Sequence, residues 1–173
     1  MEILIIILLF AALLCIWTLS VRRRLEVQEV NIRNAMNQTM IQLSAERKAL
    51  TALADLLENS IDVERYRQMK QYLEAPQDSK EEMLPEKVAK EQEMLLKVQK
   101  IIAESSEQMP LLQTQETYQK YWKAAHSYEH MVKTSSLIYN DSVENFNRML
   151  CKMPDRLAAG ICGFHQKKCL EIM

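Results

Sequence analysis

The side chains best suited to chemistry in this sequence are the cysteines and histidines near its C-terminal end. Cys162, His165 and Cys169 are spaced i, i+3 and i+7, so on a helix all three would share one face. Thiolates and imidazoles bind Zn²⁺, and this spacing therefore offers a metal-dependent regulator as an alternative function. A metal would need a fourth ligand from elsewhere, and Gly163 weakens a helix here. We therefore expect Cys162 and Cys169 to be small packing residues.

A second pair, His126 and His130, lies in the sequence His-Ser-Tyr-Glu-His. Zinc proteases place glutamate directly after the first histidine, whereas Glu129 directly precedes the second, so the pattern does not predict catalysis. The chain of 173 residues has 3 His and 2 Gly, which leaves little material for a catalytic centre or a phosphate-binding loop. We expect no catalytic residue, no metal and no cofactor. The net charge of −1 gives no basic signal, so no nucleic-acid partner is expected either.

These groups follow a long apolar run. Ile3 to Leu19 reads ILIIILLFAALLCIWTL, and only Thr18 within it is not apolar. At about 1.5 Å per residue, the run and the two residues after it come close to spanning a ~30 Å hydrocarbon core. A secretory signal peptide is the alternative, but no basic residue precedes the run. We predict a retained transmembrane helix.

Three arginines, Arg22, Arg23 and Arg24, follow the run directly. Basic residues beside a span stay on the cytoplasmic side, which predicts a very short N-terminus outside the cell. The expected organisation is a transmembrane anchor at residues 1–21 and a cytoplasmic helical domain at residues 22–173. The arginines should also attract anionic headgroups, so the lipid bilayer is an expected partner.

The rest of the chain shows helical periodicity with few chain breakers. A seam of steps of four and three runs through Met36, Met40, Leu43, Arg47, Leu50, Ala54, Leu57 and Ile61. A second seam runs through Tyr118, Trp122, Ala125, Glu129, Val132, Ser136, Tyr139, Val143, Phe146 and Leu150. Bends are expected near Asn59 and a loop from Ala75 to Pro85. The pattern predicts an all-α protein, in which a transmembrane helix precedes an antiparallel up-and-down bundle of four helices, or of three if the first helix continues to Tyr72.

Arg47 and Glu129 occupy seam positions where apolar residues are expected. Arg47 lies 25 residues after Arg22, and Glu129 lies 25 residues before Pro154. In antiparallel helices the two charges would lie at the same height. This predicts a partly buried Arg47–Glu129 ion pair that fixes the register; the alternative is that both side chains reach solvent.

The last helix and the segment after it carry a recognisable pattern. Its elements are Tyr139-Asn140, Phe146-Asn147, Pro154 and Gly163-Phe164. This pattern resembles the signature of the LemA family, although Met153 stands where the family has Phe before the proline. The resemblance implies a membrane-anchored helical bundle without established catalytic activity. We therefore expect a scaffold or interaction module that binds a protein partner through the bundle surface. A metal-dependent or lipid-sensing regulator is the alternative.

Overall fold

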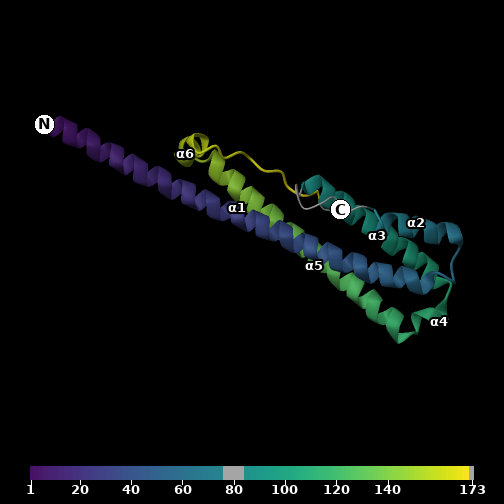
Figure 1. Cartoon of the computed structure of the whole chain (residues 1–173). Coiled ribbons are helices and arrows are strands. Elements are labelled where there is room, and N and C mark those ends of the chain that lie inside the picture. The colour runs from purple at the N-terminus through teal and green to yellow at the C-terminus, as the bar shows by residue number, and fades with distance from the viewer. Residues whose placement is uncertain (76–83, 172–173) are drawn as a thin grey trace. The chain divides into compact units, whose positions relative to one another are not determined.

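The structure, a computed structural model, describes residues 1–75 and 84–171 as a set of helices (Figure 1). They are α1 (Glu2–Leu57), α2 (Val63–Leu73), α3 (Pro85–Glu107), α4 (Pro110–Gln113), α5 (Glu116–Cys151) and α6 (Asp155–Ile161). These two ranges contain no strand. The predicted all-α class with a long apolar N-terminal helix is confirmed. The four expected long segments correspond to α1, α2, α3 and α5, and the first helix does not continue unbroken to Tyr72.

Local chemistry explains where several helices begin and where α5 ends. Asp62 is the extended N-cap of α2, and Pro85 and Pro110 begin α3 and α4, positions where proline sacrifices no intrahelical hydrogen bond. α5 stops at Cys151, three residues before Pro154, which follows a cis peptide bond. Most of the predicted loop from Ala75 to Pro85 falls on residues 76–83, outside the described residues.

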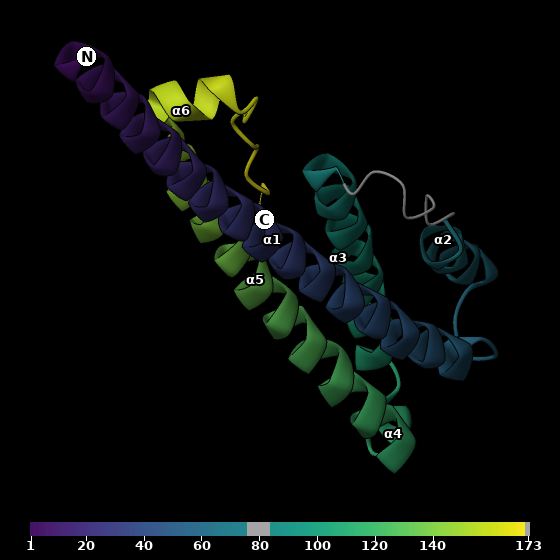
Figure 2. The ribbon, with the colours of Figure 1, turned by 60° about the vertical axis from the view of Figure 1, so that its left-hand side comes forward.

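The chain divides into two compact units, and the first comprises Met1–Ala35 and Ile138–Cys169. Its buried residues come from both long helices and from α6: Val21, Leu25, Ile32, Tyr139, Val143, Phe146, Leu150, Ala158 and Ala159. Figures 1 and 2 both place α6 beside the N-terminal part of α1. Arg24 of α1 and Asp155 of α6 are 3.6 Å apart, which ties the two elements together.

The second unit comprises Met36–Leu137 and Leu170–Met173. Within it α2 packs on α3, and polar contacts join both helices to α1 and join α3 to α5. The buried face of α1 is Met36, Thr39, Leu43, Glu46, Leu50, Leu53 and Leu57, which again step by three and four. The predicted seam shares four of these positions, and its Ala54 is buried as well, but it placed Met40 and Arg47 where Thr39 and Glu46 form the buried row.

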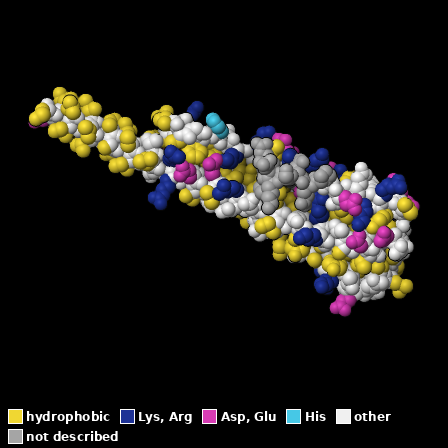
Figure 3. Space-filling model, in the orientation of Figure 1, with side chains coloured by type: hydrophobic (Ala, Val, Ile, Leu, Met, Phe, Trp, Pro, Cys, Tyr) yellow, Lys and Arg dark blue, Asp and Glu magenta, His cyan; other side chains and the backbone are white. Residues whose placement is uncertain are grey.

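One helix in the described residues, α1, is long and apolar enough to cross a membrane. None of its apolar window is buried within the structure. Figure 3 shows this part of the chain covered in hydrophobic side chains up to the first Lys and Arg side chains. The observation is compatible with membrane anchoring, because an exposed run of this kind needs an apolar environment to cover it.

Candidate functional site

Residues of the LemA-like pattern fasten the C-terminal segment onto α5 in the first unit. The Asn147 side chain makes two hydrogen bonds to the backbone of Lys167: its Nδ2 donates to the carbonyl at 2.8 Å, and the Lys167 N–H donates to Oδ1 at 2.9 Å. The Tyr139 hydroxyl donates to the carbonyl of Lys168 at 3.0 Å. Asn147, a residue of this pattern, thus makes its contacts within the protein. Asn147 and Tyr139 therefore have a structural role.

Ring and ionic contacts reinforce this attachment. Phe146 and Phe164 meet edge to face with ring centroids 6.3 Å apart. Lys167 Nζ lies 5.6 Å from the Phe146 ring centroid and 2.7 Å from Glu29 on α1. Gly163 has a φ of 75°, a left-handed conformation that lets the chain leave α6 and turn back toward α5. The segment after α6 therefore joins α5 to α1.

The three arginines after the apolar run differ in their partners. Arg22 pairs with Glu26 at 2.7 Å along the same helix, and Arg24 pairs with Asp155 at 3.6 Å. Arg23 is exposed and has no carboxylate partner among residues 1–75 and 84–171. The cluster thus keeps one uncompensated positive charge at the position where the apolar run ends.

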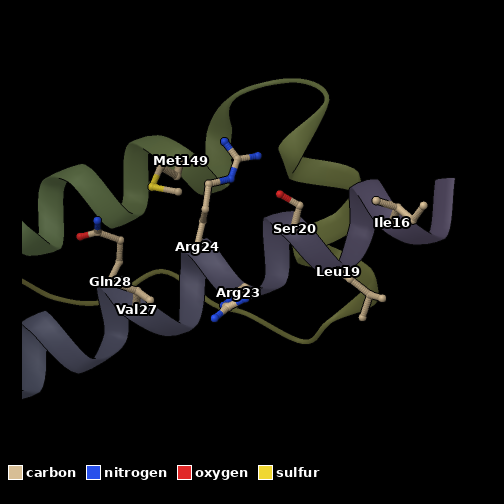
Figure 4. A pocket seen from close by; sticks show the side chains of 8 residues that line it. All are labelled: Ile16, Leu19, Ser20, Arg23, Arg24, Val27, Gln28 and Met149. Atoms are coloured by element: carbon tan, nitrogen blue, oxygen red, sulfur yellow. The ribbon is translucent and has the colours of Figure 1, made fainter. Parts of the chain in front are cut away.

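An open groove of about 500 Å³ lies beside these arginines in the first unit. Its lining consists of Ile16, Leu19, Ser20, Arg23, Arg24, Val27 and Gln28 of α1 and Met149 of α5. In Figure 4, Arg24 and Met149 extend toward each other, whereas Arg23 leaves α1 on another side. The groove is therefore apolar at one end and bordered by two cations further along the helix.

Arg47 connects three helices of the second unit. Its Nη1 donates to the carbonyl of Leu73 at 2.7 Å and to that of Ala75 at 3.4 Å, at the C-terminal end of α2. Its Nη2 is 2.8 Å from Glu91 of α3, and both side chains are largely buried, with 12% and 18% exposed. A cation at a helix C-terminus satisfies carbonyls that lack intrahelical partners.

Glu129 has a different set of partners, so the predicted Arg47–Glu129 pair is wrong. Its Oε1 accepts from Lys133 at 2.7 Å, and its Oε2 accepts from Gln99 of α3 at 3.1 Å. Burial raises the pKa of Glu129, but hydrogen bonds from Lys133 and Gln99 outweigh it and hold the pKa below its usual value. Both residues were predicted to be partly buried, but their partners were not predicted, because α3 supplies Glu91 to Arg47 and Gln99 to Glu129, and periodicity does not show which helix lies opposite.

The match to known proteins agrees with the pattern at the C-terminal end. The model of the LemA family matches residues 31–173, most of the chain. The chain belongs to the LemA family. The match begins after the apolar run and the arginines, so it covers the rest of α1 and the helices that follow in this LemA protein. No curated protein matches the chain significantly.

The predicted metal alternative at Cys162, His165 and Cys169 lacks its helical face. α6 ends at Ile161, Cys162 is its C-cap, and residues 164–171 are not helical. In the described part of this LemA chain, no group of three or more His, Cys, Asp or Glu side chains is placed to hold a metal. His126 contacts Gln99 and Glu129 instead, at 3.1 and 3.3 Å.

Glu46 is a deeply buried carboxyl group of this polar interior that the sequence analysis did not predict. It is 2% exposed, and its Oε2 has no hydrogen-bond partner within the described residues. Burial, with the negative charges of Glu129 and Glu91, raises its pKa to about 7, against a lowering by Lys133. A signal was available, because Leu43, Glu46 and Leu50 are spaced i, i+3 and i+7 like any core triplet.

The ion pair of Arg47 with Glu91 predicts a specific energetic coupling. Replacing Arg47 by Met should lower the free energy of unfolding by about 3 kcal/mol, because Glu91 and the α2 carbonyls lose their buried cation. In a double-mutant cycle with Glu91→Gln, the coupling energy should be about 1–2 kcal/mol. Chemical denaturation of the full chain in detergent, followed by circular dichroism, measures both quantities.

The control cycle pairs Arg47→Met with Glu129→Gln. These two changes should add within about 0.5 kcal/mol, because the charges have separate partners. A larger coupling energy of Arg47 with Glu129 than with Glu91 would contradict the pairing of Arg47 with Glu91.

Glu46 predicts a loss of stability as pH rises. The unfolded chain ionises this group near 4.5 and the folded chain near 7, so the folded state binds the extra proton between these values. The contribution of this proton to the free energy of unfolding is complete below about pH 4.5 and is lost as pH rises through 7, a change of about 3 kcal/mol. The Glu46→Gln variant, which cannot ionise there, should therefore exceed the wild type in melting temperature at about pH 8.5 by more than at about pH 5.5.

The exposed Glu58 provides the matched control. Glu58→Gln should change the melting temperature equally at both pH values. If Glu46→Gln showed the same small and constant difference, the carboxyl group would be ionised in the folded state across the whole range.

Proposed function

We propose that this LemA protein is a single-pass membrane protein whose cytoplasmic helical domain acts as a non-catalytic interaction module. One observation carries the proposal: the apolar segment of α1 is entirely exposed. Covering one large aliphatic side chain stabilises a protein by about 2 kcal/mol, and the run contains many of them. A bilayer is the environment that covers such a helix on all sides, because the backbone hydrogen bonds are already satisfied within the helix.

The charges beside the run support the proposed orientation. Arg22, Arg23 and Arg24 follow it, and Glu2 is the only charged side chain before it. The positive-inside rule then assigns the arginines and all that follows to the cytoplasm.

α6 supplies a second proposed contact with the bilayer surface. Leu157 and Ile161 of α6 are spaced by four residues and are 58% and 80% exposed, and Met153, two residues before the helix, is 67% exposed. The Arg24–Asp155 pair holds this helix beside the first residues after the apolar run. A short helix at this level can place such side chains among the lipid headgroups, with the exposed Lys152 and Arg156 toward anionic groups.

The interaction role draws support from how the polar residues are used. In the second unit, Arg47 with Glu91 and Gln99 with Glu129 hold helices together. Large apolar side chains remain exposed on the long helices of this unit, among them Ile41 at 64% and Leu137 at 62%. We propose that they contact a protein partner.

The membrane proposal predicts a defined topology. The full chain should remain in the membrane pellet after alkaline extraction. Its exposed Cys151 and Cys169 should resist an impermeant thiol reagent in intact cells and react after permeabilisation. These outcomes follow because the bilayer would separate both thiols from the medium.

The matched control is Glu2→Cys in a chain whose Cys151, Cys162 and Cys169 are replaced by Ser. This thiol should react in intact cells. Labelling of Cys151 without permeabilisation would contradict the orientation, and release by alkali would contradict the anchor itself.

The interaction role predicts that an apolar surface position matters for partner capture. Leu137→Asp should reduce the proteins that are cross-linked to the chain in membranes and isolated with it. Thr134→Asp, at an exposed position on the same helix, should leave them unchanged. Equal recovery from both variants would exclude this surface as the binding site.

A further inference from the structure

The groove beside the arginines has the composition of a site for one lipid molecule. Ile16, Ser20, Arg23 and Val27 recur at i, i+4, i+7 and i+11, so they follow one side of α1. Met149, on α5, borders the groove beside this side of α1 (Figure 4). We propose that this groove binds a single anionic phospholipid. The inference rests on the proposed membrane anchoring and adds a ligand to it.

Distances along α1 match the layers of a bilayer leaflet. Arg23 and Arg24 lie four and five residues beyond Leu19, or about 6–8 Å at the helical rise. The interfacial layer on each side of the hydrocarbon core is about 5–8 Å thick. Ile16 and Leu19 therefore lie at the depth of acyl chains, and the two guanidinium groups lie at the depth of lipid phosphates.

The charges at the groove complement a phosphodiester. Arg23 has no carboxylate partner among the described residues, and its side chain is exposed. Arg24 keeps 54% of its side chain exposed, and its 3.6 Å contact with Asp155 is longer than a charge-assisted hydrogen bond. A guanidinium has five N–H donors, so Arg24 can bind Asp155 and a phosphate oxygen together.

The polar residues of the groove fit the rest of the lipid headgroup. Ser20 precedes the arginines and lies at the level of the glycerol ester groups. Gln28 follows them and lies at the level of a headgroup that extends beyond the phosphate. The groove thus presents apolar, hydroxyl, cationic and amide groups in the order in which a phospholipid presents its complementary parts.

The test uses the full chain, purified in a neutral detergent with equal amounts of phosphatidylglycerol and phosphatidylcholine. Native mass spectrometry should show an adduct of one phosphatidylglycerol at least about tenfold more abundant than the phosphatidylcholine adduct, because two arginines each contribute about fivefold. Arg23→Gln should reduce the preference about fivefold. Equal occupancy by both lipids would overturn the proposal.

Two matched pairs of variants distinguish lipid binding in the groove from a general attraction of anionic lipid to positive charge. Arg33→Gln removes the same charge at an exposed position of α1 outside the groove and should leave the adduct unchanged. Ser20→Trp fills the groove without altering charge and should abolish the adduct, whereas Val30→Trp adds the same bulk outside it and should not. An adduct that survives Ser20→Trp, or falls equally with Arg33→Gln, would mean attraction of anionic lipid without a groove site.

Two further measurements identify what failed if the adduct is missing. Alkaline extraction of the same membranes tests anchoring: a chain that is retained but carries no lipid overturns the lipid site and leaves the anchor intact. A chain released by alkali overturns both. Inorganic phosphate at millimolar concentration supplies the anion without acyl chains, so displacement of the lipid by phosphate would overturn a lipid site in favour of an anion site.

Discussion

The antiparallel pairing of α1 and α5 is the constraint on which the other contacts depend. Both compact units contain a part of each helix. In the first unit, Glu29 of α1 binds Lys167, which Asn147 of α5 holds by its backbone. In the second unit, Gln42 of α1 accepts a hydrogen bond from Ser135 of α5 at 2.6 Å. Within each unit, these contacts fix the register of α1 against its partner segments.

The polar interior of the second unit places charges where apolar side chains would pack more simply. Glu46 is buried without a described partner for one of its oxygens, and Arg47 is 12% exposed and has a buried Nε without a hydrogen-bond partner in the described part of the chain. Buried charges of this kind contribute less to stability than apolar residues of similar size, but they allow only those arrangements that supply partners. In this unit the partners come from α2, α3 and α5, so the charges select how four helices assemble.

Much of this fold could be predicted from the sequence, and the errors have a common physical origin. Helical periodicity and breakers identified α1, α2, α3 and α5, and the ends near Leu57 and Cys151. The predicted seam contained Leu43, Leu50 and Leu57 but was one residue off at Met40 and Arg47, because a helix presents two adjacent rows with nearly the same spacing. Thus Arg47 was assigned to the core row, and the more deeply buried Glu46 was missed. Ion-pair partners depend on which helix lies opposite, which periodicity does not specify.

The attachment of the C-terminal segment has a consequence for which substitutions the family fold tolerates. Asn147 and Tyr139 bind backbone atoms of residues 167 and 168, not their side chains. These hydrogen bonds therefore depend on the side chains of Asn147 and Tyr139, but hardly on which residues stand at positions 167 and 168. Proline is the exception at position 167, because it has no N–H to donate to Asn147. The sequence requirement thus falls on α5, and the segment it holds can vary in charge and shape at its outward positions.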